Sequence, residues 1–182
     1  MNRIFDPFND RLARDIRNSL SSALILELTG DRLRAVLETA DQWENKGLPP
    51  VHREYIRETR ERYLQMGNDI RKSGIRDPRL QAVLLWNAGL FFEVHELLET
   101  IWHVARNTEH TALKGFIQAA GVYVHSLRGK PLAAAGLAAK ARHNLMSGRA
   151  ALGFIANLDG LISDLEKPSL QPPRLVLSQS YP

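Results

Sequence analysis

The sequence predicts an all-α protein, a compact helical bundle with an N-terminal helical extension. Apolar residues recur every three or four positions through most of the chain, which is the spacing of one helix face. Glycines and prolines interrupt these periodic stretches, and no stretch alternates as a half-buried strand would. With 182 residues, of which 44% are hydrophobic, the chain is long enough to bury a sizeable core.

Three helices are expected in the first part of the chain. Asp6-Pro7 has the form of an N-cap followed by a first-turn proline, and Gly30 closes the helix that starts there. The next helix ends at the breaker Gly47-Leu48-Pro49-Pro50. The three expected helices cover residues 7–30, 31–46 and 51–70.

Four more helices are expected, over residues 78–106, 111–127, 131–146 and 149–165. The helix that begins at Pro131 is rich in alanine and glycine, so a neighbouring backbone can approach it closely. We expect one structural domain in three parts. These are an N-terminal helical extension packed on the core (1–77), a core helical bundle (78–166) and an extended tail (167–182).

The composition excludes several classes of site. The chain has no cysteine, so disulfides, thiolate metal sites and cysteine nucleophiles are ruled out. No apolar run is long enough to span a membrane, and residues 1–30 lack the apolar core of a signal peptide. We therefore expect a cytoplasmic protein with no membrane partner.

The net charge of +4 is only mildly basic and is weak evidence for an anionic partner. Acidic and basic residues interleave over 53–62, which favours a solvated face of short-range ion pairs. Between Glu109 and Asp159 there are basic residues and no acidic ones, and we interpret them as separate surface charges on a helical hairpin. Nucleic-acid binding is therefore disfavoured, while a homo-oligomer stays open.

The segment 86–103 carries the main functional signal. At about 100° per residue, His95, Glu99 and Trp102 fall on one narrow stripe, with Phe91 beside them. The helix is apolar nearly all round, so His95 and Glu99 are expected to be buried. A buried carboxylate is costly unless it is paired, protonated or coordinated to a metal.

The following helix supplies the other half of the predicted site. Gln118 and His125 share one of its faces, and the short turn between the two helices favours an antiparallel pair. Phe91 and Trp102 are expected to pack around the polar cluster, and Glu93 or Glu96 is a further candidate metal ligand. Its members are Asn87, His95, Glu99, Gln118 and His125.

Three interpretations of this cluster remain open. In the first interpretation, the cluster is a buried hydrogen-bonded network with a purely structural role. Alternatively, His95, Glu99 and His125 bind a divalent metal, for which two imidazoles and a carboxylate suit zinc, iron or manganese. In the third interpretation, the cluster lines a pocket for a small ligand.

Several catalytic templates do not fit. His95-Glu96 begins like the zinc-protease motif HExxH, but Glu99 stands where the second histidine should be, and Glu96 projects away from the stripe. The Glu-x-x-His spacing of di-iron bundles does not occur, nor does a phosphate loop, a GxSxG elbow or a dinucleotide fingerprint. His103 is expected to be a surface histidine.

The motif Asn87-x-Gly89-x-Phe91-Phe92-Glu93-x-His95-Glu96-x-Leu98-Glu99-x-x-Trp102 resembles the family called domain of unknown function 309, whose hallmark is HxxxExxW. The resemblance continues through Gly115-Phe116-Ile117-Gln118-Ala119-Ala120, His125 and the Arg128-Gly129 turn, and covers roughly 80–145. Lys130 departs from the small polar residue common in the family. The resemblance implies a small all-α bundle and a suggested metal-binding role, without a settled activity.

The sequence therefore leads to one hypothesis with an alternative. We expect a metal-binding protein with a buried His95/Glu99/His125 site, and a metal-dependent hydrolase is an activity that such a site allows. The pocket residues are Asn87, Phe91, Glu93, Trp102 and Gln118. The alternative is a non-catalytic helical scaffold, or a module binding a small ligand or partner, whose polar network is structural. No catalytic residue is assigned, and whether the protein is an enzyme stays open.

Overall fold

The prediction of an all-α protein is confirmed. The computed structural model describes residues 4–179, and within them the chain forms eight α-helices, one short 3-10 helix and no strand. The chain divides at Arg76 into two compact units, an N-terminal unit (1–76) and a C-terminal unit (77–182). Residues 1–3 of the predicted extension and 180–182 of the predicted tail lie outside the described residues.

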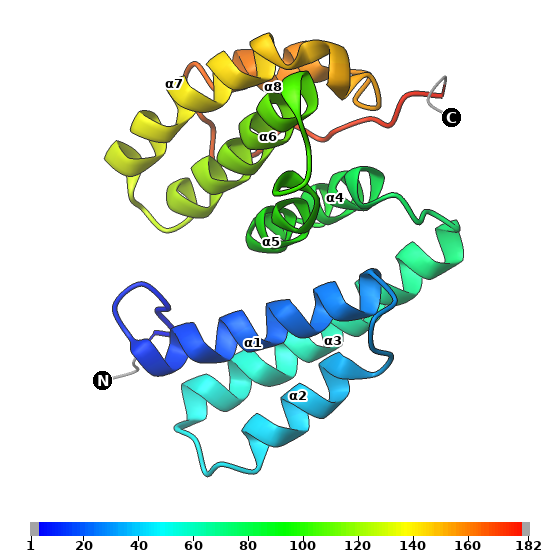
Figure 1. The fold of residues 1–182 in the computed structure, drawn as a ribbon. Coiled ribbons are helices and arrows are strands. Elements are labelled where there is room, and N and C mark those ends of the chain that lie inside the picture. The colour runs from blue at the N-terminus through cyan, green and yellow to red at the C-terminus, as the bar shows by residue number, and fades with distance from the viewer. Residues whose placement is uncertain (1–3, 180–182) are drawn as a thin grey trace. The chain divides into compact units, whose positions relative to one another are not determined.

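The N-terminal unit is a three-helix unit of α1 (Arg11–Leu28), α2 (Ala35–Glu44) and α3 (Pro50–Ser73) (Figure 1). Helix α1 begins later than Asp6-Pro7 predicted, because Asp10 is its N-cap and accepts hydrogen bonds from the backbone N–H groups of Leu12 and Ala13. Asp6 instead accepts from the Phe8 N–H in a preceding turn. On α3, His52 Nε2 lies 3.1 Å from Asp10 Oδ2 and links this helix to the α1 cap.

The C-terminal unit holds every residue of the predicted site. Its elements are α4 (Pro78–Asn87), α5 (Phe91–Trp102), α6 (Asn107–Ser126), α7 (Pro131–Ser147), the 3-10 helix η1 (Arg149–Leu152) and α8 (Leu158–Asp164). Its core contains the rings of Trp86, Phe91, Phe116 and Tyr123, with the Trp86 ring centroid 5.0–5.5 Å from those of the other three.

The prediction of one continuous helix over 78–106 is wrong, because the chain breaks between α4 and α5. Gly89 has φ of +69°, a left-handed conformation that glycine adopts without strain. The N–H of Leu90 bonds to the Leu85 carbonyl at 2.9 Å, and the N–H of Gly89 bonds to the Trp86 carbonyl at 2.8 Å. This pair of bonds is the Schellman closure of a helix C-terminus.

The helix predicted over 149–165 is also interrupted. Only η1 and α8 are helical, and the backbone of residues 154–156 pairs with the C-terminal segment instead, through an antiparallel bridge between Ile155 and Leu177. The helix predicted from Pro131 is found as α7. Among the described residues, no helix is both long enough and apolar enough to cross a membrane.

Helices α6 and α7 approach each other closely at two glycines. A Cβ atom at Gly115 would lie 2.6 Å from the backbone nitrogen of Leu145, and one at Gly148 would lie 2.4 Å from Cα of Ala112. The expected close approach to α7 is therefore real. On the α6 side, the close approach is at Gly115.

Candidate metal centre

The α4–α5 break sets where the candidate ligands lie. Helix α5 begins at Phe91, so His95 and Glu99 stand one turn apart on the same helix. His95 Nε2 lies 3.6 Å from Glu99 Oε1, and His95 Nδ1 lies 3.3 Å from Glu96 Oε1. One ligand atom from each of these three side chains can be chosen so that all lie within 4.8 Å of one another.

The prediction that this site is buried is wrong. The side chains of His95, Glu96 and Glu99 are 35%, 29% and 40% exposed. The covered face of α5 centres on Val94 and Leu98, and the candidate ligands lie on its flank. A half-exposed carboxylate retains much of its hydration, so the cost of burying a charge no longer argues for a metal. The argument now depends on the convergence of the ligand atoms.

His125 is not in the converging group. It lies in the last turn of α6, and among the described residues the third ligand atom near His95 and Glu99 comes from Glu96. A helical wheel separates Glu96 from His95 by about 100°, which is why the sequence pattern set Glu96 aside. The sequence signal for Glu96 was its position next to His95, because a carboxylate one residue away can reach the second nitrogen of the imidazole ring.

The other predicted site residues contact different parts of the C-terminal unit. The amide of Asn87 bonds to the backbone of Leu175, and Gln118 Oε1 accepts a 2.7 Å hydrogen bond from Asn144 Nδ2. The Trp102 indole donates to the His110 carbonyl at 3.2 Å and stacks on the His110 ring.

Phe91 and Glu93 lie on the covered side of α5. The Phe91 ring packs against Trp86 and Tyr123, with ring centroids 5.0 and 5.4 Å away. Glu93 is buried. Of the eight predicted site residues, the structure therefore brings His95 and Glu99 together in the candidate metal group and gives Phe91 a place in the core.

The donor set suits a hard or borderline divalent cation. Metal–nitrogen and metal–oxygen bonds of about 2.0–2.2 Å place two donors of one tetrahedral ion roughly 3.4 Å apart. The 3.6 Å between His95 Nε2 and Glu99 Oε1 is close to that spacing. With Nε2 as the ligand, Glu96 faces the opposite ring nitrogen. A carboxylate in that place orients a metal-bound imidazole and raises its basicity.

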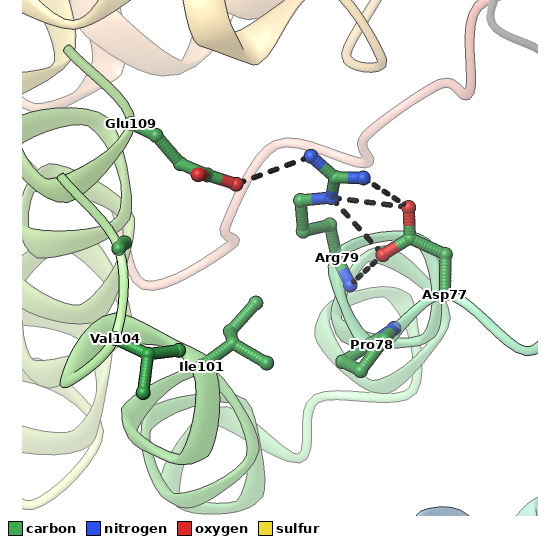
Figure 2. A pocket seen from close by; sticks show the side chains of 7 residues that line it. Asp77, Pro78, Arg79, Ile101, Val104 and Glu109 are labelled. Carbon is green, nitrogen blue, oxygen red and sulfur yellow. Dashed lines mark hydrogen bonds and ion pairs between the residues drawn. The ribbon is translucent and has the colours of Figure 1, made fainter. Parts of the chain in front are cut away.

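A separate cavity of about 280 Å³ lies where the start of α4 meets the end of α5 and the start of α6 (Figure 2). Figure 2 shows Arg79 between two carboxylates, with Nη2 2.7 Å from Asp77 Oδ2 and Nη1 3.2 Å from Glu109 Oε1. Burial acts to raise the pKa of Asp77, but hydrogen bonds from Arg79 and its positive charge lower the pKa overall. No local sequence pattern predicts this cavity, because its lining comes from the start of α4, the end of α5, the connection that follows it and the start of α6.

Residues 80–137 match the family model described as Domain of unknown function (DUF309). This segment of the chain is similar to the DUF309 family. The suspected family is therefore confirmed over a segment that contains α4 from Leu80, all of α5 and α6, and the first part of α7. Comparisons with curated proteins and with solved structures gave no match. The three candidate ligands lie inside the DUF309 segment, and no activity is assigned to that family.

Proposed function

We propose that the chain binds one divalent metal ion through His95 and Glu99, with Glu96 as the residue that orients the imidazole or completes the ligand set. One observation supports the proposal above all others. Three potential ligand atoms on a single helix lie within 4.8 Å of one another, and both ring nitrogens of His95 face a carboxylate. Because all three side chains come from α5, the site requires no alignment between helices.

The ligand chemistry narrows the choice of metal to zinc, iron or manganese. One imidazole nitrogen with carboxylate oxygens is a borderline-to-hard donor set, and the chain has no thiolate to attract a soft ion. Two or three protein ligands leave coordination positions for water. A metal ion in such a site can lower the pKa of its bound water, so hydrolysis is the activity that the proposal allows.

Metal analysis of untagged protein, purified without chelator, tests the proposal. We expect one equivalent of a divalent metal, and loss of that metal in Glu99→Gln, which keeps the shape of the side chain but removes its charge. Glu96→Gln is expected to weaken binding by about 10–100-fold, the usual effect of losing an orienting carboxylate. His125→Gln is the matched control and should bind as the parent protein does.

A protein with less than a tenth of an equivalent of metal after incubation with zinc and manganese would contradict the proposal. So would a Glu99→Gln variant with unchanged affinity. If His125→Gln rather than Glu96→Gln releases the metal, the ligand set is the one first expected from the sequence.

The second candidate is a helical scaffold or binding module in which these side chains pair only with one another. It is favoured by the same distances, because a protonated imidazole placed between two carboxylates is a stable ion-pair arrangement. At this level of exposure such pairs contribute about 0–1 kcal/mol to stability. Glu99→Gln would then change stability by no more than that, and no metal would bind.

A further inference from the structure

The C-terminal segment 173–178 runs extended and is hydrogen-bonded along both of its edges (Figure 1, red segment). On one edge, the Trp86 indole N–H donates to the Pro173 carbonyl at 2.8 Å. The Asn87 side chain binds Leu175 twice, accepting from its N–H and donating to its carbonyl, both at 2.8 Å. A single amide side chain here replaces the backbone of a neighbouring strand.

The opposite edge is held by residues 154–157. Asn157 donates to the Arg174 carbonyl and accepts from the Val176 N–H, again at 2.8 Å each. The Ala156 N–H donates to the Val176 carbonyl at 2.8 Å, and the Ser178 N–H donates to the Phe154 carbonyl at 2.9 Å.

These bonds follow the alternation of an extended strand. In a strand, the N–H and C=O groups of one residue point to the same edge, and those of the next residue point to the other edge. Accordingly, the odd-numbered residues Pro173 and Leu175 bind Trp86 and Asn87. The even-numbered residues Arg174, Val176 and Ser178 bind residues 154–157.

The recognition is mostly of backbone, with one side-chain anchor. Every hydrogen bond described above ends on a main-chain atom of the segment, so it does not depend on that residue's side chain. Leu175 is 2% exposed and so is buried against the fold, whereas the next residue, Val176, is 52% exposed. Backbone pairing combined with a pocket for one side chain is how strand-addition sites recognise extended peptides.

We propose that Trp86, Asn87, Asn157 and the backbone of residues 154–156 form a binding site for an extended peptide with an aliphatic anchor. Residues 173–178 are its resident and exchangeable ligand. The connection from α8 to this segment includes Glu166, Lys167, Leu170 and Gln171, which are exposed, so Leu175 is the buried side chain that has to leave with the segment. A short tether holds its own end at a local concentration in the millimolar range. The tail therefore excludes weak competitors until it is released. This site is independent of the metal proposal.

The test begins with the full chain carrying a specific protease site inserted between Leu170 and Gln171. The protein is folded intact and the connection is then cut, so that folding does not depend on the cut. A fluorescent synthetic peptide of residues 171–179 is titrated into the cut protein, and its anisotropy is measured. We expect saturable binding that displaces the released tail, and much weaker binding to the uncut protein.

Altered peptides test the mechanism without changing the folded protein. Leu175→Ala removes the anchor, and N-methylation at Leu175 removes the N–H that binds Asn87. Each change should weaken binding by at least about tenfold, equivalent to about 1.4 kcal/mol. Val176→Ala is the matched control for the side chain, and N-methylation at Leu177 is the control for the backbone. Both controls should bind within about twofold of the parent peptide.

Equal binding of all five peptides would overturn the proposal, because the contact would then not be the one described. Absence of peptide binding by cut protein that keeps its helical circular dichroism would also overturn it. Loss of the helical signal on cutting would show that the tail is an integral part of the fold and not an exchangeable ligand.

Discussion

Helices α6 and α7 pack too closely at Gly115 to admit even a methyl group. A Cβ atom there would lie 2.6 Å from the Leu145 nitrogen and 2.9 Å from the Asn144 carbonyl carbon. Both are backbone atoms of α7, so relief requires the helix itself to move rather than one side chain to rotate. Gly115→Ala is therefore expected to destabilise the C-terminal unit.

The size of the effect follows from two opposing contributions. Alanine is favoured over glycine in a helix by about 1 kcal/mol. Overpacking costs about 1–3 kcal/mol, and the upper end applies here because backbone is the obstacle. The net loss in the free energy of unfolding is therefore about 2 kcal/mol. At Gly136 on α7 nothing lies within 4 Å of an added Cβ, so Gly136→Ala should stabilise by about 0.5–1 kcal/mol.

Urea unfolding followed by circular dichroism measures the free energy of unfolding of both variants. The informative result is a decrease in Gly115→Ala together with an increase in Gly136→Ala. An overall perturbation of helix content would move both midpoints in the same direction. A Gly115→Ala variant as stable as the parent protein, or more stable, would refute the close approach of the two helices.

Two further predictions concern pH and capping. Burial and the hydrogen bond to Asp164 raise the pKa of Tyr123, so the folded state keeps a proton that the unfolded state loses above about pH 10. The free energy of unfolding should therefore fall as the pH rises beyond that point, and this fall should be smaller in Tyr123→Phe, as measured by urea unfolding. Asp77 caps α4, so Asp77→Ala should cost about 1 kcal/mol, while Asp77→Asn keeps the cap and loses only the charge beside Arg79. Because the pKa of Asp77 is lowered in the fold, its ionic contribution is present at neutral pH and lost as the pH falls through that lowered pKa, so the stabilities of the parent protein and Asp77→Asn should converge in acid urea melts.

The helices that were predicted best are those bounded by local signals. Pro131 in a first turn and the glycine that follows Ser147 delimit α7, and Gly74 ends α3 in a left-handed conformation. The break at Gly89 was missed because apolar residues stand on both sides of it and continue a helical pattern. What ends α4 is the closure around Gly89, and a single glycine within a helical pattern does not specify that closure.

The same distinction applies to the site. The proximity of His95 and Glu99 could be predicted, because a four-residue spacing on one helix fixes it without any tertiary information. Burial and the approach of His125 depend on how α5 meets its neighbours. The site is half-exposed, and His125 lies outside the converging group of the described residues. The pairing of Asn87 with Leu175 spans 88 residues, so no local pattern could have revealed it.

X-ray absorption at the zinc edge, recorded on zinc-loaded and dialysed full-length protein, tests the central claim most directly. Coordination through His95 with carboxylate oxygens predicts one imidazole nitrogen and two or more oxygens at about 2.0–2.2 Å, with the imidazole contribution lost in His95→Gln. A zinc shell made only of oxygen, an imidazole signal that survives His95→Gln, or the absence of zinc after dialysis would contradict the claim.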